Sequence, residues 1–212
     1  MTVIFTDGFE NNNILAWTGS VIQGANTLAT SSTQKNTGVY SLYINQPSSG
    51  SDIYVYKDLN GASLYYAREY VYFTTLPTGI DSVITLLDGA TSRGLHTTYV
   101  SGAGWALKLI QSATVDYQSA VTASTGQWYC IELELLLSTT VGVAKLWVDG
   151  SLTVNQTGLN TSEIATINML RSGISSFSGT SEVYVDDVVV ADAYIGLSSV
   201  SYTRTLTDLL GV

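Results

Sequence analysis

The stretch WYCIELELLLSTTVGVAKLWVDG, residues 128–150, decides the fold class of this chain. From residue 130 to 135 a thiol and two carboxylates alternate with aliphatic side chains, and this period of two places the apolar side chains on one face of a strand. A polar turn at 138–142 follows, and 143–148 is again extended, rich in β-branched and aromatic residues. Asp149-Gly150 then tolerates the positive φ angles of a tight hairpin. The local unit is therefore an antiparallel meander with one buried face and one wet face.

The same alternation runs outward along the chain. The longest predicted strand is 63–74, entered through a turn at Asn60-Gly61, and 182–192 is a late strand that buries one side through valines. The two faces of 63–74 are Leu64, Tyr66, Arg68, Tyr70 and Tyr72 against Tyr65, Ala67, Glu69, Val71 and Phe73. The valines expected to be buried in the late strand are Val183, Val185 and Val189. About a dozen strands, with turn signals between them, predict a sandwich of two antiparallel sheets. Only the segment 205–210 leans towards helix.

Composition excludes several classes of function. The 212 residues include only 8 Lys and Arg, and the net charge is −9. Both values argue against binding to nucleic acid, which requires clustered positive charge. No apolar run approaches the ~18 residues of a membrane span, and the N-terminus lacks the pattern of a secretory signal. We expect a chain made without a signal, or a mature domain with an added Met1. The single cysteine, Cys130, excludes an intramolecular disulfide and is expected to be a packing or surface residue.

Several motifs occur together in a characteristic order. They are Phe9-Glu10, Trp17, Gly38-x-Tyr40-Ser41-Leu42, Tyr66-x-Arg68-x-Tyr70-x-Tyr72-Phe73 with Leu76-Pro77, Gly126-Gln127-Trp128-Tyr129-x-x-Glu132, Leu146-Trp147-Val148-Asp149-Gly150, Val185-Asp186-Asp187-Val188-x-Val190 and Tyr194-Ile195-Gly196. Over residues 3–196 the chain resembles the concanavalin A-like lectin/glucanase superfamily, in its laminin-G-like jelly-roll branch. The resemblance implies an all-β jelly-roll domain over 1–196 and leaves 197–212 as a C-terminal tail, a linker or an assembly arm.

The resemblance also raises the question of catalysis. Retaining glycosidases place two carboxyl groups about 5–5.5 Å apart and inverting ones about 6.5–9.5 Å apart. Glu132 and Glu134 lie about 7 Å apart in an extended strand, but the third acid of the laminarinase-like motif is absent, and an outward polar face explains both residues. His96 is the only histidine and is expected at a strand surface. We therefore expect a domain without catalysis.

Calcium is the cofactor that the resemblance implies. Related modules join an acidic residue of the N-terminal Phe-Glu segment to one from the C-terminal Asp-Asp strand. This predicts a structural calcium site from Glu10 with Asp186 or Asp187, helped by Asp7, because calcium takes six to eight oxygen ligands. The alternative is that the two aspartates end a strand and cap neighbouring amides.

Aromatic side chains supply the candidate ligand surface, since sugar rings stack on aromatic faces and arginine donates a planar fork of hydrogen bonds. The candidate carbohydrate-binding residues are Tyr66, Arg68, Tyr70, Tyr72 and Trp105, the last flanked by glycines that would expose it. The alternative is that these aromatics pack between the sheets, as expected for the core anchors Trp17, Trp128 and Trp147.

The expected function is a lectin-like module that binds a glycan or polysaccharide on a cell or particle surface, as in a phage appendage or a microbial surface protein. The first alternative is a structural or decoration protein of a virion or extracellular filament, which assembles with itself or with virion partners. The second is an enzyme acting on polysaccharide. All three place the protein outside the cell, at its surface or in a virion, without membrane insertion.

Overall fold

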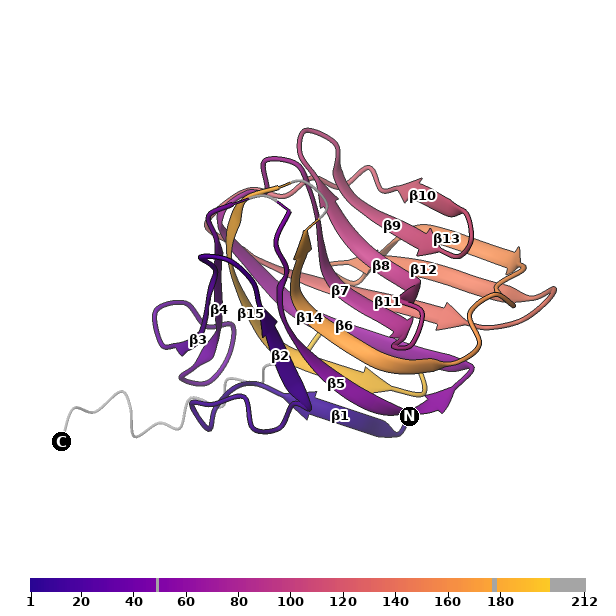
Figure 1. The fold of residues 1–212 in the computed structure, drawn as a ribbon, viewed down its shortest axis with the longest axis horizontal. Coiled ribbons are helices and arrows are strands. Elements are labelled where there is room, and N and C mark those ends of the chain that lie inside the picture. Colours follow the sequence, from indigo (N-terminus) through magenta and orange to yellow (C-terminus); the bar gives the residue numbers. More distant parts are fainter. Residues whose placement is uncertain (49, 177–178, 199–212) are drawn as a thin grey trace, which may run out of the picture.

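The computed structural model describes residues 1–48, 50–176 and 179–198, which form fifteen strands and no helix. The strands make two antiparallel sheets stacked face to face (Figure 1), so the predicted all-β two-sheet sandwich is confirmed. The helix-leaning segment 205–210 lies outside the described residues. Within the described residues there is no helix of the length and hydropathy that a membrane span requires.

Each sheet combines strands from distant parts of the sequence. Sheet A has the order β13 (Ser151–Leu159), β12 (Gly142–Val148), β11 (Trp128–Leu136), β6 (Leu64–Thr75), β15 (Ser181–Ala191), β4 (Ser41–Gln46) and β3 (Thr27–Ser31), and β1 (Val3–Asp7) also pairs with β15. Sheet B has the order β10 (Thr114–Gln118), β9 (Gly104–Ile110), β8 (Arg93–Val100), β7 (Ile80–Asp88), β14 (Ile167–Ser176), β5 (Ile53–Ala62) and β2 (Gly19–Ile22).

The core lies between the sheets and follows the predicted alternation. Tyr65, Val71 and Phe73 of β6 point into it, as do the alternate aliphatic residues of β11. Trp105 of β9 is also fully buried there, with its ring 5.7 Å from that of Phe73 and 5.5 Å from that of Tyr99. The expectation that Trp105 is exposed is therefore wrong, because β9 places it on the inner face of sheet B.

The other tryptophans divide between core and surface. Trp17 is buried and packs edge-on against Phe5, with 4.9 Å between ring centroids. Trp128 and Trp147 are half-buried on the outer face of sheet A, so they are not the core anchors that their positions suggested. In both strands the residues next to the tryptophan, such as Tyr129 and Leu146, occupy the core instead.

Turns and bulges account for the remaining differences. Asp149 and Gly150 both have positive φ, at 50° and 74°, so the predicted hairpin is confirmed. The turn expected at Asn60-Gly61 is wrong, because β5 continues to Ala62. In β15 the pairing shifts between Asp186 and Val189. This bulge turns Val189 out of the core, and Val188 and Val190 are buried in its place.

Candidate functional site

A row of polar side chains crosses the outer face of sheet B. The residues stand directly opposite one another on six successive strands: Tyr56, Arg171, Thr85, His96, Lys108 and Asp116. Side chains at directly opposed positions of antiparallel strands share a face. With strands about 4.8 Å apart, this polar row spans about 24 Å.

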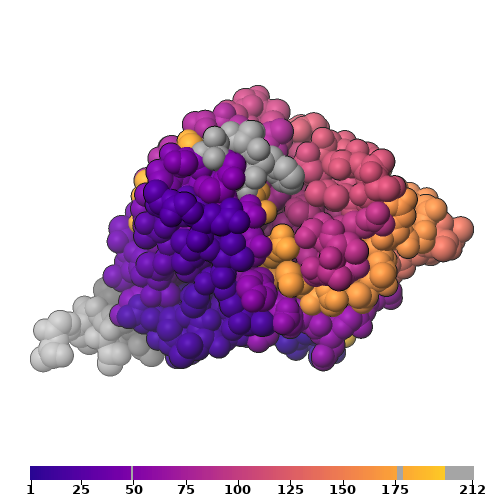
Figure 2. All heavy atoms as spheres, viewed as in Figure 1, coloured from indigo at the N-terminus to yellow at the C-terminus, as the bar shows by residue number. Residues whose placement is uncertain are grey.

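The middle of the polar row lies at the bottom of a hollow. Thr85 is 1% exposed and His96 4% exposed, although both point away from the sandwich core. Ser82 and Thr98, on the same face, are buried as well. Figure 2 shows the surface hollowed between the N-terminal strands and the β8–β9 region, with atoms of β14 at the bottom. We call this hollow the groove.

Arg171 provides a positive charge in the groove. Its guanidinium lies over the Tyr54 ring, 4.8 Å from the centroid, and Nη2 donates to Ser92 Oγ over 3.4 Å. Its Nε and the hydroxyl of Thr85 are buried atoms without a hydrogen-bond partner among the described residues. None of the three ion pairs in the described part of the chain includes Arg171. The guanidinium can therefore bind an anionic group of a ligand.

His96 is a neutral imidazole at the centre of the polar row. Burial, and then the charges of Arg171 and Lys108, lower its pKa to about 4. Ser82 Oγ lies 3.3 Å from Nδ1. His96 lies in a strand, as predicted, and points away from the sandwich core. Its side chain is nevertheless buried in the groove, so the predicted surface exposure is wrong. The imidazole is therefore uncharged at neutral pH, and the burial and the two cations that keep it so also make it a weak base.

The carbohydrate-binding residues predicted from β6 lie on the opposite side of the molecule, on the outer face of sheet A. The segment 194–198, which we call the strap, crosses this face. Arg68 donates to the carbonyl of Gly196 over 2.7 Å, and the Tyr70 hydroxyl accepts from the amide of Ser198 over 2.9 Å. Both side chains are buried as a result. Of the predicted set, Tyr66 and Tyr72 remain half-buried at the surface.

The two glutamates of β11 also have partners within the fold. Glu132 accepts hydrogen bonds from the amides of Ile195 and Gly196, over 2.7 and 2.8 Å. Glu134 lies 3.0 Å from Lys145 Nζ. The face of β11 expected to be wet is therefore covered, and the structure gives each glutamate a partner within the fold.

The three predicted calcium ligands meet around the loop 36–40. Glu10 accepts from the amides of Val39 and Tyr40, while Asp186 accepts from the amides of Asn36 and Thr37. Asp187 accepts from the Asn36 side-chain amide and the Thr37 hydroxyl. Asp7 is used elsewhere, by the Phe9 amide and the Trp17 indole.

The electrostatics of this acidic cluster favour a cation. Burial, and then the charge of Asp187, raises the pKa of Asp186 to about 7. No ion pair found among the described residues includes Glu10, Asp186 or Asp187. However, no group of three or more His, Cys, Asp or Glu side chains in that part of the chain has the arrangement of a metal site. Carboxylate oxygens are the donors that calcium takes, but here backbone amides hold Glu10 and Asp186, and side chains of the loop hold Asp187.

Comparison with known proteins identifies the fold. The sequence matches no protein-family profile and no curated protein. Among solved structures it is similar to the cellulose induced protein Cip1, with a TM-score of 0.70, 18% identity, and coverage of 91% of this chain and 99% of that one. An endo-β-1,4-glucuronan lyase from the fungus Trichoderma reesei gives a TM-score of 0.67 and 12% identity, over 91% and 96% of the two chains.

A third similar structure is domain 4 of AbnA, an extracellular GH43 arabinanase from Geobacillus stearothermophilus, in complex with arabinotriose. Its TM-score is 0.65 with 14% identity, over 91% of this chain and 93% of that one. At these identities the likeness shows a shared β-sandwich fold, consistent with the concanavalin A-like resemblance. The fold is one that carbohydrate-binding and carbohydrate-active proteins use.

The expectation of a domain without catalysis is corrected by this comparison. It depended on the glutamates of β11 and on a surface position for the single histidine. A lyase has the same sandwich over nearly the whole chain, and here His96 lies beside charged groups in a groove. The fold and the residues therefore do not exclude an enzyme.

Proposed function

We propose that the groove of sheet B binds an acidic polysaccharide, through the polar row, outside the cell. The observation that carries the proposal is the position of Arg171, a guanidinium without an ion pair among the described residues, at the bottom of an extended hollow. A uronate carboxylate is the sugar group that a planar guanidinium binds best. The similarity in fold to a glucuronan lyase supports this choice of ligand.

The surrounding residues provide the rest of a sugar-binding surface. Tyr54 is held in place by Arg171, and Tyr56 lies opposite Arg171 on the neighbouring strand. Aromatic rings pack against the C–H faces of sugars, and Tyr56 is half-buried at the surface. The polar row of about 24 Å gives room for several consecutive sugar units.

Equilibrium binding of oligoglucuronate tests this proposal, with the same oligosaccharide reduced at its carboxyl groups as the comparison ligand. A hydrogen bond to a charged group contributes about 1.5–3 kcal/mol, so Arg171→Gln should weaken oligoglucuronate binding by roughly 10- to 150-fold. Lys35→Gln removes the same charge from an exposed position far from the groove and should leave the affinity unchanged. Equal affinity of wild type and Arg171→Gln would contradict the proposal.

A second candidate function is β-elimination on the bound uronate, which the neutral His96 two strands from Arg171 favours. The guanidinium would neutralise the carboxylate, and the imidazole would take the proton from the adjacent carbon, C5. The electron pair of that C–H bond would form the C4=C5 double bond as the C4–O bond to the neighbouring sugar breaks, and the imidazolium would return its proton to the departing oxygen. Formation of an unsaturated uronate, followed by its ultraviolet absorbance, tests this activity. His96→Gln should abolish the absorbance change while retaining binding. Binding without any product from wild-type protein would limit the groove to recognition.

We also propose that calcium occupies the acidic cluster of Glu10, Asp186 and Asp187 as a structural ion. These residues would hold it through carboxylate oxygens, and the ion would offset the repulsion between the two neighbouring aspartates. The cluster joins the loop that follows β1 to β15 and to the loop 36–40, so its role would be to fix these three segments to one another.

A further inference from the structure

Four aromatic rings form a continuous row on the outer face of sheet A, on the side of the sandwich away from the groove. Tyr43, Tyr184, Tyr72 and Trp128 stand opposite one another on β4, β15, β6 and β11. Successive ring centroids are 5.0, 6.1 and 5.5 Å apart. All but Tyr184 are half-buried, so their rings contribute to the surface. We call this set the aromatic row.

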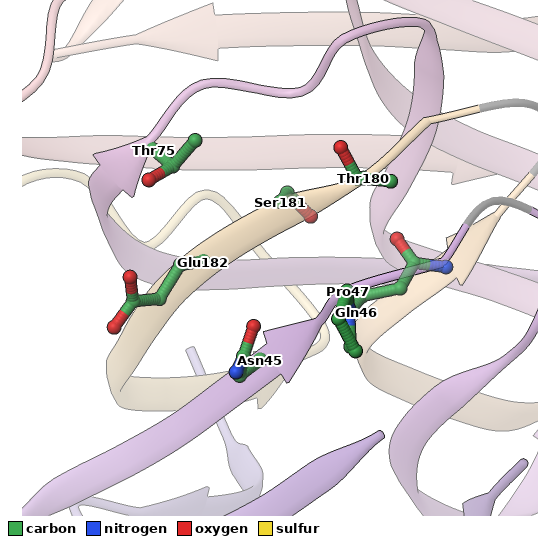
Figure 3. Close-up of a pocket in the computed structure, with 7 residues that line it drawn as sticks. All are labelled: Asn45, Gln46, Pro47, Thr75, Thr180, Ser181 and Glu182. Carbon is green, nitrogen blue, oxygen red and sulfur yellow. The ribbon is translucent and has the colours of Figure 1, made fainter. Parts of the chain in front are cut away.

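A pocket of about 160 Å³ adjoins the aromatic row. It is lined by Asn45, Gln46, Pro47, Thr75, Thr180, Ser181 and Glu182 (Figure 3). Asn45 and Glu182 are paired across β4 and β15, each two residues from a tyrosine of the row, so they share the face of these tyrosines. Thr75 is paired with Glu182 from the other side. Asn45, Glu182 and Thr75 therefore stand side by side at the pocket, about 7 Å along the strands from the aromatic row.

One hydrogen bond joins the two features. The Tyr43 hydroxyl donates to Glu182 Oε1 over 2.9 Å. Burial, followed by this hydrogen bond, raises the pKa of Tyr43 to about 12, so the hydroxyl stays protonated and orients the carboxylate at the pocket wall. The aromatic surface and the polar pocket are thus fixed relative to each other.

The chemistry of the pocket selects against an anion. Its lining offers a carboxylate, two amides and three hydroxyls, but no Lys, Arg or His. Carboxylates and amides bind sugar hydroxyl groups, whereas a uronate beside Glu182 would bring two like charges together. Aromatic rings next to such a hydrogen-bonding set match a pyranose, which has an apolar C–H face and a polar edge.

We infer that the aromatic row and the adjoining pocket form a second carbohydrate site, which takes a neutral oligosaccharide. This inference stands on sheet A alone and does not rest on the groove. The two sites would differ in charge preference, since the groove has a cation and this pocket an acidic residue.

The same face provides a matched control. Tyr66 is also a half-buried tyrosine of β6 on the outer face, but its ring packs with Trp147, 6.2 Å away, and Trp147 packs with Tyr194 of the strap. Tyr66 therefore belongs to a separate aromatic group at the other end of β6. Tyr66→Ala removes the same side chain from the same strand without touching the proposed site.

The test is titration of the whole chain with neutral gluco-, manno-, xylo- and galacto-oligosaccharides, followed by tryptophan fluorescence and calorimetry. At least one should bind, and Tyr72→Ala, Trp128→Ala and Glu182→Ala should each raise its Kd by about tenfold or more. Tyr43→Phe retains the ring but frees Glu182, and should raise the Kd less than Glu182→Ala does. Tyr66→Ala and Arg171→Gln should leave the Kd within about twofold.

Three results would overturn the inference. The first is that none of the four classes of neutral oligosaccharide binds to the folded chain. The second is that Tyr66→Ala weakens binding as much as Tyr72→Ala, with both variants folded by circular dichroism. The third is that Trp128→Ala converts an oligomer into a monomer, which would make this face an interface between copies. Loss of oligoglucuronate binding in Arg171→Gln, with neutral binding intact, would separate the two sites.

Discussion

Ser172 of β14 donates a hydrogen bond of 2.6 Å to Glu69 Oε2 of β6, and so joins the two sheets through the core. Glu69 is fully buried, and its other carboxylate oxygen has no partner among the described residues. Burial raises the pKa of Glu69 to about 8, although the bond from Ser172 lowers it. The core therefore contains a carboxyl group that is protonated at neutral pH.

Glu69 should make the protein less stable as the pH rises. Between its ordinary pKa of 4.5 and the folded value of about 8, the folded state binds more protons than the unfolded state. The free energy of unfolding therefore falls across that window. In Glu69→Gln the amide replaces the neutral carboxyl, so the variant should exceed wild type near the upper end of the window, by on the order of a few kcal/mol. Urea unfolding at several pH values measures the difference. Parallel profiles for the two proteins would rule this out, and Asp58→Asn, at an exposed position, serves as the control.

The strap should detach when Glu132 is removed. Glu132→Ala deletes the acceptor of two amide hydrogen bonds, so the amides of Ile195 and Gly196 should exchange with solvent faster. The loss in stability should be about 1–3 kcal/mol. Glu134→Ala, on the same strand face, removes an ion pair to Lys145 and should leave strap exchange unchanged. If exchange over 194–198 is the same in both variants, Glu132 does not hold the strap.

The thiol of Cys130 should be unreactive in the folded protein. Burial raises its pKa to about 11, and the residue is 3% exposed. Only the thiolate reacts with alkylating reagents. Iodoacetamide should therefore modify the chain in urea but not in native buffer, as mass spectrometry would show. Rapid native labelling would mean that the outer face of β11 opens readily.

Calcium should stabilise the acidic cluster in a pH-dependent way. Adding calcium should raise the melting temperature and a chelator should lower it. The effect should grow as the pH rises through about 7, since the ion requires Asp186 to release its proton. Asp186→Asn and Glu10→Gln should lose the response, while Asp7→Asn should keep it, because Asp7 binds Phe9 and Trp17 instead. A melting temperature unmoved by chelator, with no metal in elemental analysis, would disprove the site.

The fold was predictable because each strand carries its own pattern. Alternation in 130–135 identified the inner face correctly, and Asp149-Gly150 identified a hairpin. In 63–74 the alternation separated the two faces but left open which of them is buried, because both carry large aromatic residues. The bulge at Asp187 could not be predicted from this alternation. The residue adopts a positive φ although it is not a glycine, and nothing in the local sequence marks the position at which the pairing of β15 shifts by one residue.

The groove was not predictable because it depends on register. Tyr56, Arg171 and His96 come from strands far apart in the sequence, and no local spacing relates them. Their alignment depends on the register in which six strands pair. A slip of one residue in any of these strands would move its side chain to the opposite face of the sheet. The cover over Arg68 and Tyr70 was hidden for the same reason, since the strap returns from a distant part of the chain.

The pairing of β1 with β15 determines how this sandwich can be inserted into another polypeptide. Val3 lies opposite Ala191, and the amide of Thr2 donates to Asp192 Oδ1 over 2.6 Å. The backbone thus enters the sandwich at β1 and leaves it after β15 at neighbouring points. A host polypeptide can carry the whole sandwich as a cassette spliced into one of its surface turns, because the splice needs only two short joints. For the same reason, cutting the sandwich open at a distant turn and joining β1 to β15 through a short linker would give a permuted chain with the groove and the aromatic row intact.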